Sequence, residues 1–135
     1  MSELRTDTIT ASDGTSPVTL TGQTAAKAWV NFDGTASGAA SRDSFNISGM
    51  TDVNTGKYTA SYVNSMSNGT YAFTTATVDT STISRGGNTL NLRDGSSPET
   101  GNIKLEARYG ANSTNSGGLG DQDFMFVTVM GDLAT

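Results

Sequence analysis

Residues 44–78 constrain the fold most, because stretches of alternating apolar and polar residues come between clusters of turn-forming residues. The alternating stretches lie at 44–47, 57–63 and 71–78, and runs of Asp, Asn, Ser and Gly separate them. Alternation with a period of two predicts half-buried strands, and these turn residues predict tight connections. The segment therefore predicts a β-meander, and it contains no recognisable catalytic constellation.

The composition predicts an all-β domain. Only 34% of the 135 residues are hydrophobic and 16% are charged, so Thr, Ser, Gly and Asn dominate the remainder. Thr and aromatic residues favour strands, whereas Gly, Asn and Ser favour turns. Low charge argues against intrinsic disorder, which combines low hydrophobicity with high net charge. We expect one domain at residues 25–135, preceded by an arm at residues 1–24.

Charge and missing residue types exclude several functional classes. The net charge is −5 and the eight basic residues are isolated, so we expect no contact with nucleic acid or with an anionic membrane. No apolar run approaches the roughly 20 residues that span a bilayer. The chain has no Cys and no His, which removes thiolate metal sites and the commonest general base. We therefore expect no enzyme, no cofactor, and, because no secretory signal is visible, synthesis in a cytoplasm.

Residues 1–24 have too little apolar surface to fold by themselves. Apart from Met1, Leu4 and Ile9 are the only large apolar residues before Val18, and Leu20 completes the set. We expect these four residues to pair with another chain or with a larger assembly. The alternative is a frayed terminus, as at many domain ends.

The sequence after residue 24 predicts a series of short strands. Residues 25–32 alternate and predict a strand, although the alanines make a short helix at 24–29 the competing prediction. Further strands are predicted at residues 42–47, 57–63, 70–79, 89–93, 103–109 and 123–130. This spacing, with Gly-rich turns, predicts a sandwich or a small barrel, and we expect a jelly-roll-like antiparallel β-sandwich.

The last predicted strand, at residues 124–130, is apolar on both faces and is therefore expected to be covered on both sides. We assign Met125, Val127 and Val129 to a subunit interface. The other face is assigned to the core. The expected core residues are Phe45, Ile47, Tyr58, Tyr62, Tyr71, Phe73, Leu90, Leu92, Ile103, Leu105, Phe124 and Phe126.

The signals for chemistry are weak. Asp121 and Asp123 could present carboxylates to Ca²⁺, but a calcium site needs about 6–8 oxygen ligands and no loop motif supplies them. A charged loop before an apolar strand is the preferred interpretation. Trp29, Tyr71 and Tyr109 are conceivable platforms for a glycan, although aromatic residues on strands belong more often to the core.

The order of several segments resembles β-rich modules in tail-fibre and appendage proteins of environmental and marine bacteriophages. These segments are SELRTDTIT (2–10), DGTSPVTL (13–20), AAKAWVNF (25–32), RDSFNIS (42–48) and TDVNTGKYT (51–59). The last apolar strand belongs to the resemblance as well, whereas the stretch between it and the meander matches no pattern. The shared motifs are structural, so no catalytic residue carries over.

The resemblance implies a virion structural protein that assembles as a homotrimer and contacts other virion proteins. The chain lacks a long shaft and coiled-coil heptads, so it is expected to be a short tail fibre or appendage subunit, attached through its N-terminal arm. Contact with a host-surface glycan is an additional role left open. The alternatives are a capsid decoration protein, a free carbohydrate-binding module and, least favoured, a polysaccharide depolymerase.

Overall fold

The computed structural model describes residues 25–80, 86–112 and 116–134, so the predicted arm at residues 1–24 is outside it. The four candidate attachment residues also lie outside the described residues: Leu4, Ile9, Val18 and Leu20. The described residues form nine strands: β1 (Ala26–Asp33), β2 (Ala40–Phe45), β3 (Ile47–Asn54), β4 (Lys57–Tyr62), β5 (Ala72–Val78), β6 (Gly86–Leu92), β7 (Asn102–Gly110), β8 (Gly118–Leu119) and β9 (Phe124–Met130). Among the described residues, no helix is long and apolar enough to cross a membrane.

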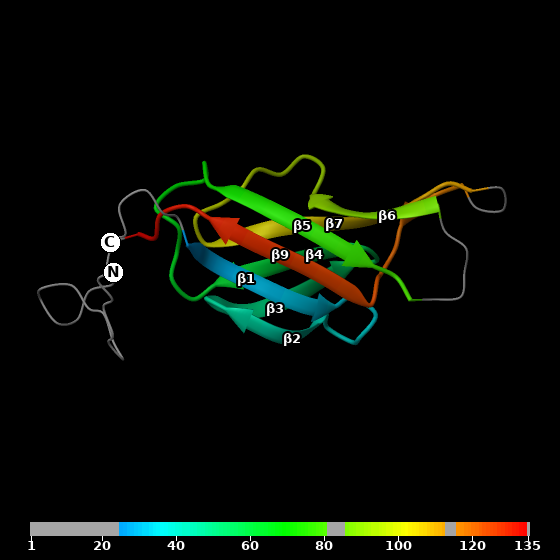
Figure 1. Cartoon of the computed structure of the whole chain (residues 1–135), viewed down its shortest axis with the longest axis horizontal. Helices are drawn as coiled ribbons and strands as arrows, with labels where there is room; N and C mark the ends of the chain where they lie inside the picture. The colour runs from blue at the N-terminus through cyan, green and yellow to red at the C-terminus, as the bar shows by residue number, and fades with distance from the viewer. Residues whose placement is uncertain (1–24, 81–85, 113–115, 135) are drawn as a thin grey trace, which may run out of the picture.

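The strands form two antiparallel sheets that pack face to face (Figure 1). Sheet A has the order β2-β1-β9-β5, and sheet B has the order β3-β4-β7-β6, with the short β8 paired to β7. The prediction of an all-β protein with antiparallel sheets is confirmed. One hydrophobic core lies between the sheets, and the edge-to-face contact of Phe32 with Tyr58, 5.2 Å between ring centroids, joins β1 to β4 across it.

The first described strand forms despite a sequence that could support a helix. Ala28, Val30 and Phe32 of β1 face the core and are fully or almost fully buried. β1 also pairs with β2 on one side and with β9 on the other. Burial and pairing on both sides outweigh the helical preference of the alanines, so the competing prediction of a helix at 24–29 is wrong where the residues are described.

The predicted meander is only partly correct. β3 and β4 form an antiparallel hairpin in sheet B, but β5 belongs to sheet A, where it pairs with β9. The predicted strand at 42–47 is divided at Asn46, which has a φ of 57° and marks the passage from sheet A to sheet B. An Asn tolerates this left-handed conformation better than most residues, so the chain can turn sharply there.

Most of the predicted core is confirmed. Six of the expected residues are buried and three more pack partly buried against the core. The buried six are Tyr58, Tyr62, Tyr71, Leu90, Ile103 and Leu105, and the partly buried three are Ile47, Phe73 and Leu92. The prediction is wrong for Phe45, which is 54% exposed, and for Phe124 and Phe126, each 36% exposed.

The predicted subunit interface on the last strand is also wrong. Met125, Val127 and Val129 of β9 have at most 2% of their surface exposed, because they face the core. Their backbone partners in β1 include the inward-facing Val30, opposite Val127, and Phe32, opposite Met125. Side chains that already fill the core cannot contact a second subunit, so the outward face of β9 carries Phe124 and Phe126 instead.

Candidate interaction surface

The outward face of sheet A is continuous across its four strands. Trp29 of β1 lies opposite Phe45 of β2 and Thr128 of β9, so these three side chains share one face. The next row contains Asp43, Asn31, Phe126 and Ala76. We call this surface the outer face of sheet A: Trp29, Asn31, Asp43, Phe45, Ala72, Thr74, Ala76, Val78, Phe124, Phe126, Thr128 and Met130.

This face is mostly apolar, with large and small residues on different strands. Phe45, Phe124 and Phe126 are the exposed aromatic residues, and Val78 on β5 is 51% exposed. The other outward residues of β5 are Ala or Thr, whose small side chains project little from this side of the face. Contiguous exposed apolar surface of this kind marks interaction sites in soluble proteins.

The outward face of sheet B is different because it carries charged residues in partnered positions. Lys57 of β4 lies opposite Glu106 of β7, and Thr59 lies opposite Lys104. Glu106 is 3% exposed and accepts a 2.6 Å hydrogen bond from Arg108 Nε. Sheet B therefore presents a polar surface to solvent, whereas sheet A does not.

A bulge places a cation at the rim of the outer face of sheet A. The register of β1 with β2 shifts between Asn31 and Phe32, which leaves Arg42 as the extra residue. Its guanidinium lies 4.2 Å from the centroid of the Phe124 ring and 2.7 Å from Asp33 Oδ2. The hydrogen bond from the Thr35 hydroxyl, together with the charge of Arg42, holds the pKa of Asp33 below its usual value. Arg42 thus covers part of one ring at the edge and leaves the centre of the face open.

The segment before β9 is held by hydrogen bonds within the protein. Asp121 Oδ1 accepts hydrogen bonds of 2.6 Å from the Gly56 N–H and from the Tyr58 hydroxyl. Gln122 is fully buried and donates to the Arg108 carbonyl over 3.1 Å. Asp123, the second residue considered as a calcium ligand, accepts hydrogen bonds from Thr80 instead. These bonds lower the pKa of the Asp123 carboxyl group.

The two carboxylates weighed as calcium ligands therefore serve different protein donors. Among the described residues, no group of three or more acidic side chains is arranged to hold a metal ion. The arrangement anchors the last strand to β4, β5 and β7.

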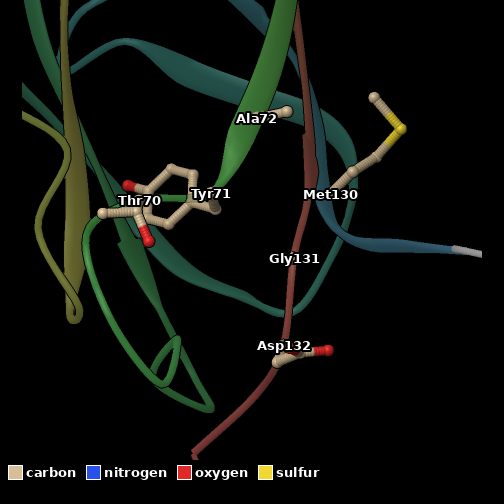
Figure 2. A pocket seen from close by; sticks show the side chains of 6 residues that line it. All are labelled: Thr70, Tyr71, Ala72, Met130, Gly131 and Asp132. Carbon is tan, nitrogen blue, oxygen red and sulfur yellow. The ribbon is translucent and has the colours of Figure 1, made fainter.

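A shallow, open depression lies beside the ends of β5 and β9 (Figure 2). Its volume is about 430 Å³, and its lining consists of Thr70, Tyr71, Ala72, Met130, Gly131 and Asp132. The Tyr71 hydroxyl is turned toward the core, where it accepts a 3.1 Å hydrogen bond from Tyr62 and donates one of 3.2 Å to the Glu99 carbonyl. Thr70 and Asp132 are then the main polar side chains that line the depression. The depression therefore lacks the convergent polar groups of a ligand pocket.

The three aromatic residues considered for glycan binding do not form one platform. Trp29 is half-buried on the outer face of sheet A, Tyr71 is buried, and Tyr109 lies on β7 in sheet B. The aromatic residues that accompany Trp29 are Phe45 and Phe126, which sequence reasoning placed in the core. No sequence signal could have placed Phe126 on this face, because the pairing of β9 with β1 decides which side of β9 is inward.

The chain matches no protein-family model, no curated protein and no solved structure. We therefore infer its function from the surface itself.

Proposed function

We propose that this chain is a non-enzymatic structural protein of a bacteriophage virion: a short tail-fibre or appendage subunit. It assembles as a homotrimer and attaches to the particle through residues 1–24. The observation that carries the proposal is the contrast between the two sheets, because the outer face of sheet A is apolar and that of sheet B is polar. A sandwich with one apolar outer face is suited to assembly.

The conformation of the loops supports a scaffold role. Asp121 and Gln122 are committed to hydrogen bonds with other strands, and the depression near Tyr71 has few polar groups. Catalytic groups in a cleft would instead converge on a shared position. The sequence resemblance to phage fibre modules supports the same role.

The only support for the jelly roll expected from sequence is that the strands form two packed sheets. Eight of the strands form two packed antiparallel sheets, as in the jelly rolls of viral capsid and lectin domains. However, β1–β2, β3–β4 and β6–β7 are each hairpins within one sheet. These hairpins favour a simple antiparallel sandwich over a jelly roll.

Two alternatives remain. A capsid decoration protein would use the same apolar face but attach to the shell. A carbohydrate-binding module is favoured by the exposed rings of Phe45 and Phe126 beside Trp29, since flat aromatic surfaces can stack on sugars.

Purified particles of the virus that encodes the chain test the proposal. Immunogold labelling with an antibody against residues 25–135 is expected to mark the tail, whereas labelling spread over the shell would support a decoration protein. Deletion of residues 1–20 is expected to abolish incorporation. The matched control replaces only Thr8 by Ser, which leaves Leu4 and Ile9 unchanged. Normal incorporation of the truncated chain would refute attachment through the arm, and absence of the full chain from particles would refute the virion role.

A further inference from the structure

The outer face of sheet A lacks a partner within the described part of the chain. It carries Phe45, Phe124, Phe126 and Val78 at the surface, and Trp29 lies half-buried among them. Figure 1 shows β1, β9 and β5 together on one side of the molecule, with the strands of sheet B behind them. Nothing else in the described residues covers that side.

The charges on the strands of sheet A are balanced, although the chain as a whole is acidic. The four strands of sheet A carry only Lys27, Asp33, Arg42 and Asp43 as charged residues. These two positive and two negative charges leave the strands of sheet A with no net charge, in a chain whose net charge is −5. Two copies can therefore approach through this face without the repulsion that the net charge produces elsewhere.

The size of the face limits the strength of the contact. Four strands spaced about 4.8 Å apart, each about 7 residues long at roughly 3.3 Å per residue, give a planar area of about 440 Å². A standard interface buries about 800 Å² per partner. The face is thus large enough to form the centre of an interface and too small to make a tight one, so association through it depends on concentration unless residues 1–24 add contacts.

From these observations we infer that the outer face of sheet A is the contact surface between copies of this chain. The inference rests on the homotrimer of the proposed function and specifies its geometry. In each copy sheet A faces the neighbouring copies, and the polar face of sheet B faces solvent. Phe126, central on β9, lies in the middle of the contact, with Asn31 and Asp43 in the same row and Arg42 at the rim over Phe124.

The chain contains a built-in reporter of this contact. Trp29 is its single tryptophan and lies on the proposed interface, opposite Phe45 and Thr128. Over a concentration series of the full chain, sedimentation velocity is expected to show a shift from monomer to trimer. Trp29 emission should move to shorter wavelength, and quenching by acrylamide should decrease, over the same concentrations.

The deciding variant is Phe126→Glu, and its matched control is Val53→Glu. Val53 is an apolar residue of β3 in sheet B and is 52% exposed. We expect Phe126→Glu to shift the midpoint of association at least tenfold to higher concentration and to abolish the Trp29 shift. Val53→Glu should leave both unchanged.

A second measurement does not depend on a destabilising charge. The chain has no cysteine, so Thr128→Cys on the outer face and Thr59→Cys on sheet B each introduce one thiol at a half-buried mid-strand position. Maleimide is expected to label Thr128→Cys several-fold more slowly at high protein concentration than at low concentration. Thr59→Cys should be labelled at a constant rate.

The outcomes separate this inference from the proposed function. A trimer that survives Phe126→Glu, labels Thr128→Cys at a constant rate and is lost on deletion of residues 1–20 would refute the interface and leave the trimer intact. A chain that stays monomeric at every concentration would refute the interface, whether or not it is found in particles. A monomer whose Trp29 emission responds to a soluble oligosaccharide would likewise refute it, in favour of glycan binding at this face.

Discussion

The Tyr58 hydroxyl donates a 2.6 Å hydrogen bond to Asp121 Oδ1, and this bond ties β4 to the segment that leads into β9. The same oxygen accepts the Gly56 N–H over 2.6 Å. The Gly56 carbonyl in turn accepts the Ala107 N–H of β7 over 2.7 Å. One carboxylate therefore holds together a tight turn, the centre of sheet B and the approach to the central strand β9 of sheet A.

Replacing Asp121 by Ala should destabilise the protein by about 2–3 kcal/mol, because two donors lose a charged acceptor and Tyr58 is buried. Asp121→Asn keeps one acceptor oxygen and should cost less. Urea unfolding measures both changes. Asp132→Ala, at an exposed aspartate, is the control and should change the stability little. Equal stabilities of Asp121→Ala and Asp132→Ala would show that the Asp121 hydrogen bonds do not stabilise the fold.

Gly34 lies where a side chain does not fit. A Cβ at this position would overlap the Met125 methyl group and the Tyr58 hydroxyl, and would lie 2.8 Å from Tyr58 Cζ. Gly34→Ala is therefore expected to cost about 1–3 kcal/mol in unfolding free energy, as overpacking does. The control is Gly49→Ala in β3, where no atom lies within 4 Å of the added Cβ. Thermal unfolding of the two variants should differ clearly, and similar midpoints would contradict the predicted clash.

Asn46 combines an unusual backbone conformation with hydrogen bonds to two segments. Its Nδ2 donates to the Lys27 carbonyl over 2.9 Å and to the Asn64 carbonyl over 3.0 Å, and its Oδ1 accepts the Asn64 N–H over 2.7 Å. Asn46→Gly loses these bonds but tolerates the φ of 57°. Asn46→Ala loses both advantages and should be less stable than Asn46→Gly by about 1–2 kcal/mol. Denaturant titration of the two variants measures the free-energy cost of the backbone conformation at residue 46. Equal stabilities of the two variants would exclude backbone strain at this position.

Burial raises the pKa of Tyr58, Tyr62 and Tyr71 above the ordinary value of 10.0. The hydrogen bonds from Tyr58 to Asp121 and from Tyr62 to Tyr71 add to the shifts of the two donors. Because the folded-state pKa exceeds the unfolded one, this contribution to stability is fully present below pH 10 and is lost as the pH rises further. Unfolding free energy should therefore decrease above about pH 10, by about 1.4 kcal/mol per pH unit for each of the three tyrosines.

The matched variant for this pH dependence is Tyr62→Phe, which removes one of the three titrating groups. Its alkaline slope should be about one third less steep, even if its stability at neutral pH is lower. Ultraviolet absorbance of the folded protein provides an independent readout. Titration of all tyrosines near pH 10 in the folded state would contradict the predicted shifts.

Local sequence patterns determined the fold class and most strand positions. Alternation at 57–63 and 103–109 predicted β4 and β7, and Tyr58 and Leu105 are buried as expected. Such patterns work because alternate side chains of a strand point to opposite faces, and this property depends only on neighbouring residues. Turn residues mark the strand ends for a similarly local reason.

The orientation of β9 depended on tertiary structure. Its sequence, FMFVTVM, is apolar at every position except Thr128, so alternation could not tell which face is inward. Pairing with β1 decides it, because Val30 and Phe32 face the core and bring Val127 and Met125 to the same side. A shift of one residue in this register would reverse every side chain of the strand.

The sequence by itself thus determined that the chain forms antiparallel strands around a core rich in tyrosine. Only the tertiary structure decided that Asn46 passes the chain between sheets and that β5 joins sheet A. It also decided that the exposed rings of Phe45 and Phe126 share a surface with Trp29. The physical reason is that strand formation is a local preference, whereas the outward face of a doubly apolar strand is set by partners that are distant in sequence.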